Sequence, residues 1–432
     1  MNGVNGNIIL INLSKKILYL IIFFITFFFI FGVKTPIGSL GQILTACIIF
    51  MGLFFYNKKL ILMPKFVFFL LIFLLVDISI SLVWPIILNT YDFSIIPTKV
   101  NLVLSIISCY ILSFYFYEKF NERTFFRFIC LVFLVQSLIV FLMLINSDFS
   151  NFIMTNTKDS AIVERMVNNY SGSRGLGLAD SAAFGFSVVM ALFILIVFYS
   201  FVKKHINIVE FLPIIFFGTI ASISAGRISI LGLILGLVIL VISLRSKKVF
   251  IVISFISVSS FFTLNYLIGL RYEVIEMSSL SSFYNFMMEP IFSYIDYGVF
   301  ATSSTDGLKN MYFTLSESQF IYGDAKYSEG AGYYMGTDAG YMRFSLFYGA
   351  INSLYLYMVF FSFLFFLCLK FKNNIDKIFM FLVISLSFML HYKGEVVLFS
   401  ISYNKLLFLV LFFLYFNYKI RNDSTLKYRT LG

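Results

Sequence analysis

The stretch ADSAAFGFSVVMALFILIVFYSFVKK, residues 179–204, decides the class of fold. It carries no charged residue between Ser181 and Val202, and the lysines Lys203 and Lys204 follow directly. An uncharged apolar run of about 20 residues is long enough for a helix to cross the hydrocarbon core of a bilayer. Lysines after such a run are typical of its cytoplasmic side. The stretch therefore predicts a membrane-spanning helix that ends in the cytoplasm.

The rest of the chain repeats this pattern. Sixty per cent of the 432 residues are hydrophobic, only 12% are charged, and the mean hydropathy is +0.95, which excludes an ordinary soluble domain. The apolar stretches predict about twelve spans, at residues 17–33, 37–56, 66–88, 97–117, 125–146, 179–202, 207–223, 227–244, 249–269, 339–369, 375–391 and 396–418. The stretch 339–369 is too long for one straight crossing. The sequence predicts an all-α polytopic membrane protein with a single domain, residues 1–432.

The positions of the cations predict the orientation. Every second short connection carries at least two lysines or arginines, among them Lys58-Lys59, Lys119 with Arg123, Lys203-Lys204 and Lys370 with Lys372. Because Lys and Arg accumulate in cytoplasmic loops, both termini are expected in the cytoplasm. The net charge of +11 follows from this orientation, and no nucleic-acid-binding motif accompanies it.

Two connections on the expected external side are long, at residues 147–178 and 270–338. Loops of this length are usually functional. The larger loop is acidic and rich in Tyr and Phe, and a helix along the membrane face is expected near residues 282–300. Aromatic rings stack on sugar faces and carboxylates accept hydrogen bonds from sugar hydroxyls, so the loop suits a carbohydrate. Interfacial anchoring of the same rings is the alternative.

Four external cations lie where spans meet the external loops: Arg174, Arg227, Arg343 and Lys393. A cation near hydrocarbon usually has an anionic partner, and the planar guanidinium suits two-point contact with phosphate oxygens. Together they predict a diphosphate-binding site. Each cation alone is equally compatible with a side chain that reaches for lipid headgroups.

Two residues are candidates for proton transfer. Asp338, between Gly336 and Gly340, is a candidate general base, and capping of a helix is the alternative. His391 stands close to Lys393 and Glu395, and a histidine on the external side is expected to move a proton near neutral pH; a structural hydrogen bond is the alternative. The residues expected to contact substrate are Tyr333, Tyr334, Tyr341 and Glu395.

Charges and small residues inside the spans predict internal contacts. Asp77 and Lys405 lie within apolar stretches, and we expect an ion pair between them, with a transport relay as the alternative. Gly232 and Gly236 predict close packing of two helices. The sequence contains no cluster with metal-ligand spacing, so no metal or cofactor is expected.

Three segments carry a resemblance to a known family: SRGLGL at 173–178, SISAGR at 222–227 and GTDAGY at 336–341. With the twelve expected spans and two enlarged loops, they make the chain similar to the Wzy-type O-antigen polymerases, relatives of the WaaL-type O-antigen ligases. The spacing from Arg174 to Gly185 also resembles a loop motif of the polymerases, which the second loop lacks.

The resemblance implies a metal-independent glycosyltransferase of GT-C-like architecture in the bacterial inner membrane, with periplasmic loops. Its substrate would be an oligosaccharide on undecaprenyl diphosphate, polymerised into O-antigen or capsular polysaccharide. Arg174, Arg227 and Arg343 would hold the diphosphate, and Asp338 or His391 would be the base. Whether a separate chain-length regulator binds stays open.

Other functions remain as alternatives. A ligase would transfer a similar glycan to lipid A core, and the larger loop lacks the histidine that is typical of ligases. A Wzx-type flippase would move the lipid-linked unit across the membrane, which Asp77 and Lys405 favour and the long external loop disfavours. A purely structural scaffold leaves the external arginines without a role.

Overall fold

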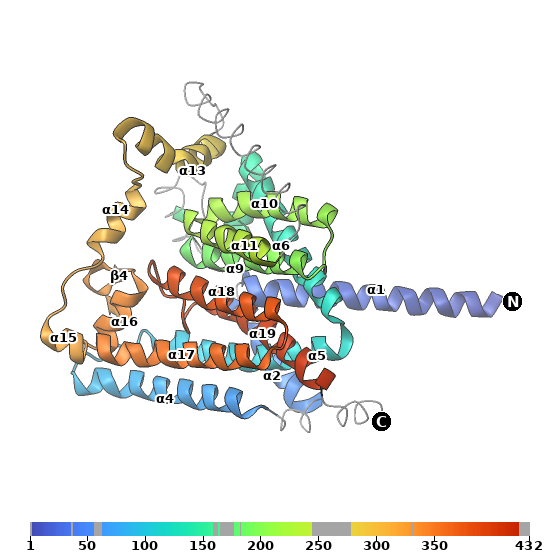
Figure 1. Ribbon diagram of the computed structural model, residues 1–432, viewed down its shortest axis with the longest axis horizontal. Helices are drawn as coiled ribbons and strands as arrows, with labels where there is room; N and C mark the ends of the chain where they lie inside the picture. Colours follow the sequence, from blue (N-terminus) through green and yellow to red (C-terminus); the bar gives the residue numbers. More distant parts are fainter. Residues whose placement is uncertain are drawn as a thin grey trace.

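The computed structural model describes residues 2–35, 38–55, 63–158, 163–164, 177–181, 183–243, 278–330 and 332–422, and they are mostly helical (Figure 1). The α-helices are α1 (Asn2–Phe31), α2 (Leu40–Phe55), α4 (Lys65–Ile87), α5 (Ile96–Lys119), α6 (Glu122–Ile145), α7 (Ser147–Thr157), α9 (Phe184–Val202), α10 (Ile208–Ala225), α11 (Ile230–Ser243), α13 (Ser278–Tyr297), α14 (Ser303–Asn310), α15 (Glu317–Ile321), α16 (Gly340–Tyr348), α17 (Ala350–Lys370), α18 (Asn374–His391) and α19 (Ile401–Asn422). Short 3₁₀ turns form η1 (Arg227–Ser229) and η3 (Tyr334–Gly336). Two antiparallel hairpins pair β1 (Lys34–Thr35) with β2 (Gly38–Ser39) and β3 (Ser328–Glu329) with β4 (Gly332–Tyr333).

The helices are those of a polytopic membrane protein. Within the described residues, eight are long and apolar enough to cross a bilayer: α4, α5, α6, α9, α10, α17, α18 and α19. Shorter apolar helices cover 16–31, 40–54 and 227–243. The expected span 249–269 lies outside the described residues. The predicted fold class, an all-α polytopic membrane protein, is therefore confirmed.

The long stretch 339–369 is two helices and not one tilted span. The break falls at Gly349, whose φ is +87°, between α16 and α17. A β-carbon at Gly349 would collide with the carbonyl oxygen of Ile321, because α15 packs against this point. Glycine is the residue that tolerates both the positive φ and the close approach.

The centre of the bundle is formed by α9 and α19. In their apolar windows, 89% and 78% of the residues are buried, against 28% for α4, so α4 is a peripheral helix. Helix α11 packs closely on α9: a β-carbon at Gly232 would collide with the backbone of Ala191, and one at Gly236 with the ring of Phe198. The predicted close packing at these glycines is confirmed.

The connections lie alternately at two ends of the bundle. At one end, Lys203 after α9 contacts Asp376 in α18 at 2.8 Å and Glu122 in α6 at 3.4 Å. The other end carries the connections 32–39, 88–95 and 392–400 together with α13, α14 and α15, opposite the start of α1 (Figure 1). Which of the two ends faces the cytoplasm stays a prediction from the charge pattern.

Both long connections contain helices. The first, 147–178, begins with α7, and the second, 270–338, contains α13, α14 and α15 before the β3–β4 hairpin. The helix expected near 282–300 is α13, which contacts α6 and α10. The loop is therefore a folded structure over the end of the bundle.

The expected ion pair between Asp77 and Lys405 is wrong. Asp77 pairs with Lys99, both buried, and the hydroxyl of Tyr348 donates to Asp77 at 3.0 Å. Lys405 instead donates to the carbonyl oxygen of Gly41 at 2.8 Å. Lys99 lies in the first turn of α5, so the helix, and not a free loop, fixes it opposite Asp77.

Replacement of Gly232 by Ala should lower the thermal stability of the purified protein. The added methyl group meets the backbone of Ala191, and overpacking of this kind costs about 1–3 kcal/mol. The matched control is Gly307→Ala in α14, where no atom lies within 4 Å of the new methyl group. Equal melting temperatures for the two variants would contradict close packing of α11 on α9.

Asp77→Asn should destabilise the protein strongly, because it leaves the Lys99 charge buried without its partner; such a loss costs about 3–5 kcal/mol. The double variant Asp77→Asn with Lys99→Met should recover most of this stability. Lys309→Met, which removes the exposed pair with Asp306, is the control and should change little. A double variant as unstable as Asp77→Asn alone would contradict the pairing. The readout is the melting temperature in detergent.

Candidate functional site

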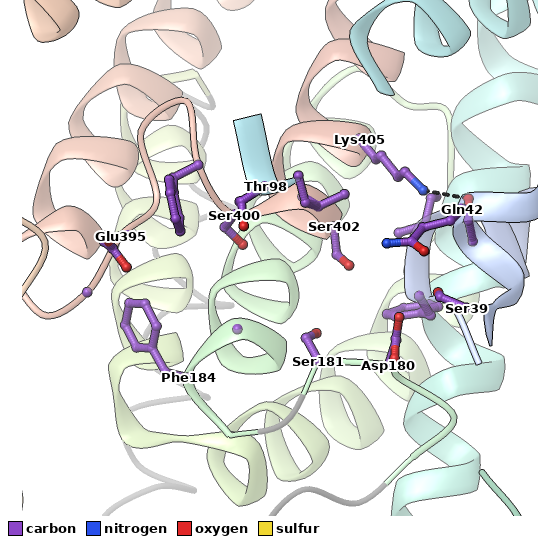
Figure 2. Close-up of a pocket in the computed structure, with 18 of the residues that line it drawn as sticks. Ser39, Gln42, Thr98, Asp180, Ser181, Phe184, Glu395, Ser400, Ser402 and Lys405 are labelled. Atoms are coloured by element: carbon purple, nitrogen blue, oxygen red, sulfur yellow. Dashed lines mark hydrogen bonds between the residues drawn. The ribbon is translucent and has the colours of Figure 1, made fainter. Parts of the chain in front are cut away.

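A polar cavity of about 460 Å³ lies at the end of the bundle that carries the long loops. Its wall comes from the end of α1, the start of α2, α5, α9 and α19, and the segment that leads into α16. Figure 2 shows Glu395 on one side of the cavity and Lys405, Gln42 and Asp180 on the other. The polar lining residues are Ser39, Gln42, Thr98, Asp180, Ser181, Tyr333, Asp338, Arg343, Glu395, Ser400, Ser402 and Lys405.

Close backbone contacts hold the wall together. The N–H of Asp180 donates to the carbonyl oxygen of Phe31 at 2.9 Å, which ties the segment before α9 to the end of α1. A β-carbon at Gly41 would lie 3.2 Å from the Cα of Gly32, so α1 and α2 approach closely at their turn. These contacts bring residues that are far apart in the sequence to one cavity.

An ion pair between Arg343 and Glu395 forms one end of the cavity. Nη1 of Arg343 lies 2.9 Å from Oε2 of Glu395, and Nη2 donates to the carbonyl oxygen of Tyr327 at 3.1 Å. The guanidinium lies between two rings, 3.7 Å from the centroid of Tyr327 and 4.2 Å from that of Tyr333. The Tyr327 hydroxyl donates to both carboxylate oxygens of Glu395 at 2.6 Å.

Asp92 fixes the loop that carries Tyr327. Its Oδ2 accepts from the N–H groups of Tyr327 at 2.6 Å and Ser328 at 2.7 Å. In the same connection, Thr90 donates to the carbonyl oxygen of Ala325 at 2.7 Å. The connection between α4 and α5 therefore positions Tyr327, the residue of the large loop that contacts both Arg343 and Glu395.

The protonation of Glu395 is set by its burial. Burial raises the pKa of Glu395 to about 7, although Arg343 and the Tyr327 hydroxyl both act to lower it. Burial and the neighbouring Glu395 raise the pKa of Tyr327 well above its usual range, so its hydroxyl remains a donor. A carboxyl group that changes protonation near neutral pH is suited to accept a proton.

Lys405 lies on the opposite side of the cavity. Its Nζ donates to the carbonyl oxygen of Gly41 at 2.8 Å and lies 4.5 Å from the centroid of the Phe29 ring. Asp180 and Ser402 line the same part of the cavity (Figure 2). Sequence reasoning missed Asp180, although a carboxylate just before an apolar span is a signal that could have identified it.

Four of the residues predicted from the sequence come together at this cavity: Tyr333, Asp338, Arg343 and Glu395. Arg174 lies outside the described residues. The other predicted residues make contacts of their own away from the cavity lining: Arg227, Tyr334, Tyr341, His391 and Lys393.

His391 is fully buried, and protein groups engage both of its ring nitrogens. Nδ1 accepts from the N–H groups of Val396 at 3.0 Å and Val397 at 3.1 Å. Nε2 lies 3.0 Å from the hydroxyl of Tyr357. Since Nδ1 is an acceptor here, the proton resides on Nε2 and faces Tyr357. These contacts are those of the structural alternative: His391 shapes the turn between α18 and α19.

The remaining cations are also engaged with the large loop. Arg227 contacts Glu289 at 2.7 Å, and its guanidinium lies 4.2 Å from the centroid of the Phe286 ring, so it joins η1 to α13. Lys393 donates to the hydroxyl of Ser304 at 2.7 Å, at the start of α14. Both residues connect the large loop to the bundle.

The two other tyrosines also contact the protein. The hydroxyl of Tyr341 donates to the carbonyl oxygen of Phe388 at 3.0 Å. The hydroxyl of Tyr334 donates to Asp324 at 3.0 Å, and Lys326 lies over its ring. Of the predicted tyrosines, Tyr333 is therefore the one whose side chain lines the cavity.

Infrared spectroscopy should detect a carboxyl group that titrates near pH 7 and is absent in Glu395→Gln. Below about pH 7 the group is protonated, and above it the carboxylate pairs with Arg343. Arg343→Gln should move the titration to higher pH, because the guanidinium lowers the pKa of Glu395. Glu329→Gln, at an exposed carboxylate, is the control and should leave the band in place. A titration unchanged in Arg343→Gln would contradict the coupling.

Comparison with protein-family models, with curated proteins and with solved structures finds no match to this chain. Its function is therefore inferred from the chemistry of the cavity. That chemistry combines a buried carboxyl group near its titration point, a guanidinium between two tyrosine rings, and a lysine at the far side.

Proposed function

We propose that this chain is a membrane glycosyltransferase that polymerises oligosaccharide units carried on undecaprenyl diphosphate into O-antigen or capsular polysaccharide. The observation that carries the proposal is the polar cavity in which Glu395, Asp338 and Arg343 lie together at the end of an apolar helical bundle. The three short motifs and the arrangement of spans and loops that resemble the Wzy-type polymerases add to it.

The reaction needs one proton acceptor and one leaving group. A sugar hydroxyl of the acceptor unit loses its proton to a carboxylate, and its oxygen forms a bond to the anomeric carbon of the donor glycan. The bond between that carbon and the diphosphate oxygen breaks, and the lipid diphosphate leaves with the electron pair. The proposed step uses no metal and no nucleotide sugar.

Glu395 is the proposed proton acceptor, with Asp338 as the second carboxylate of the cavity. A pKa of about 7 places Glu395 where a general base is most effective at neutral pH. Arg343 holds Glu395 in place and stabilises the carboxylate form. Glu395 therefore takes over the role that the sequence suggested for His391, whose nitrogens are both engaged.

Tyrosine rings provide the proposed sugar contacts. Tyr333 is 46% exposed although its ring packs against Arg343, so one face remains available at the cavity. A sugar ring that stacks there would bring its hydroxyls close to Asp338 and Glu395. Stacking on an aromatic face together with hydrogen bonds to carboxylates is a usual mode of carbohydrate recognition.

The orientation belongs to the same proposal. About twelve spans, with both termini in the cytoplasm, would expose the cavity on the periplasmic face of the bacterial inner membrane. Lipid-linked units reach that face after they have been flipped, so a polymerase is expected to act there.

Deletion of the gene gives a different result for a polymerase, a ligase and a flippase. A gel of the surface polysaccharide should show a ladder that collapses to a core with one repeat unit, which is the polymerase result. Loss of every repeat unit with accumulation of long lipid-linked polymer would instead indicate a ligase. Lipid-linked single units trapped on the cytoplasmic face would indicate a flippase, and an unchanged ladder would contradict all three functions.

Variants of the cavity should then separate chemistry from folding in the complemented strain. Glu395→Gln should reduce polymerisation by about 10²–10⁴-fold, and Asp338→Asn should reduce it less if Glu395 is the base. For the wild type, the rate should fall as the pH drops below about 7, because Glu395 becomes protonated. The control Glu329→Gln should polymerise normally. Full activity of Glu395→Gln at normal membrane levels would contradict the assignment.

A further inference from the structure

The cavity carries opposite charge on its two sides. On one side, the two carboxylates Glu395 and Asp338 accompany the single guanidinium of Arg343. That guanidinium already pairs with Glu395 at 2.9 Å. A ligand with several negative charges is repelled from this side, because two carboxylates face one cation.

The opposite side carries the reverse balance. Lys405 lines the cavity there and interacts electrostatically with Asp180. Asp180 also interacts with Lys158, whose Nζ donates to the carbonyl oxygen of Ala179 at 2.7 Å. Lys158 offsets the charge of Asp180 from outside the cavity lining, so the ammonium group of Lys405 can attract an anion to this side.

Lys405 has donors left for a ligand. Within the described residues, its ammonium group makes one hydrogen bond, to the carbonyl oxygen of Gly41, and it also lies over the face of the Phe29 ring. An ammonium group carries three N–H donors. Lys405 is 3% exposed, and a buried ammonium group with one carbonyl oxygen as its acceptor is stabilised further when an anion binds it.

The start of α19 adds further donors to the same place. Among the described residues, no acceptor binds the backbone N–H groups of Ile401, Ser402 and Tyr403, in the first turn of this 22-residue helix. The buried hydroxyl of Ser181 also has no hydrogen-bond partner there. Ser181, Ser400 and Ser402 lie between Glu395 and Lys405 in the cavity (Figure 2). A helix N-terminus with serines and a lysine is well suited to phosphate oxygens.

We infer that the Lys405 side of the cavity is a phosphate subsite that binds the diphosphate of the lipid-linked substrate. This inference rests on the proposed function and assigns the diphosphate to Lys405, the start of α19 and Ser181. Arg343 is then a positioning residue for Glu395, and not the diphosphate clamp that the sequence suggested. Gln42, at the start of α2, is exposed and lines this side, so the isoprenoid chain would leave the cavity beside α2.

The arrangement separates the two charges that form in the reaction. The proton moves to Glu395 on the acidic side, while negative charge develops on the leaving diphosphate beside Lys405. An ammonium group fixed next to the leaving oxygen stabilises the transition state more than the ground state, because negative charge on that oxygen increases as the bond to the anomeric carbon breaks. Lys405 would therefore affect the rate as well as the binding.

Binding of undecaprenyl diphosphate to the full chain in phosphatidylcholine nanodiscs tests the subsite. Lys405→Met should weaken binding by about ten- to hundredfold, the effect of one lost charge-assisted contact, and Lys405→Arg should retain most of it. Asp180→Asn should bind more tightly, because it removes a repelling charge. Lys370→Met is the matched control, since Lys370 also lies over a phenylalanine ring, 4.8 Å from Phe366, but at the other end of the bundle.

Two further probes identify the source of the phosphate. Undecaprenol, which lacks the diphosphate, should bind equally to the wild type and to Lys405→Met. Phosphatidylglycerol in the nanodisc should compete only weakly; strong competition that is lost in Lys405→Met would assign the site to bilayer headgroups and overturn the inference.

The remaining outcomes separate this inference from the proposed function. Unchanged diphosphate binding in Lys405→Met and in Asp180→Asn, with normal polymerisation in cells, would overturn the subsite and leave the polymerase function standing. Absence of diphosphate binding to a wild type that still polymerises would do the same. Absence of both binding and polymerisation would overturn both. Tighter binding of Asp180→Asn supports the subsite even where Lys405→Met fails to fold.

Discussion

The ion pair between Arg343 and Glu395 joins two parts of the chain that would otherwise leave the cavity open. Arg343 belongs to α16, after the large loop, and Glu395 belongs to the turn between α18 and α19. Tyr327 contacts both partners and is itself held by Asp92 from the connection between α4 and α5. Three connections thus meet at one pair of charges. Because the pair is buried, loss of either partner leaves a charge without compensation, and the wall of the cavity depends on both.

In the proposed reaction, one side of the cavity accepts the proton and the other side binds the leaving anion. One side holds a carboxyl group that gains or loses a proton near neutral pH, and the other holds an ammonium group with free donors. Serine hydroxyls lie between them. A transfer that takes a proton at one atom and releases an anion at another is served by this separation, since a carboxylate and the leaving diphosphate would repel each other if they lay side by side.

The class of fold and the packing of the spans could be predicted from the sequence, because they follow from apolar length and from small residues at helical spacing. Gly232 and Gly236 show this for α11. The partner of Asp77 could not be predicted: Lys99 and Lys405 are both lysines near spans, and only the packing of α4 on α5 decides between them. The break between α16 and α17 at Gly349 could not be predicted from the sequence either, because it depends on the close approach of Ile321 from the large loop.

The site was predicted in part. Asp338, Arg343, Glu395 and Tyr333 stand near one another at loop ends, where polar residues beside a span are conspicuous. Asp180 lies more than 150 residues before them in the sequence, and Lys405 was expected to pair with Asp77, so their place in the same cavity follows only from the fold. For His391 the sequence left a chemical and a structural role open, and its hydrogen bonds from the N–H groups of Val396 and Val397 are those of the structural role.

The large loop is attached to the bundle at several places, among them the contacts of Arg227 with Glu289 and of Lys393 with Ser304. Residues 322–328 contact Trp84, Thr90 and Asp92, whereas Tyr312 donates to the carbonyl oxygen of Tyr392 at 2.5 Å and stacks on its ring. The segment 298–301 between α13 and α14 lies between the attachments at Glu289 and Ser304, and Gly298 has open space around it. Insertions and substitutions in that segment leave the attachments intact. This segment can therefore change in sequence while Asp338, Arg343 and Glu395 keep their positions at the cavity.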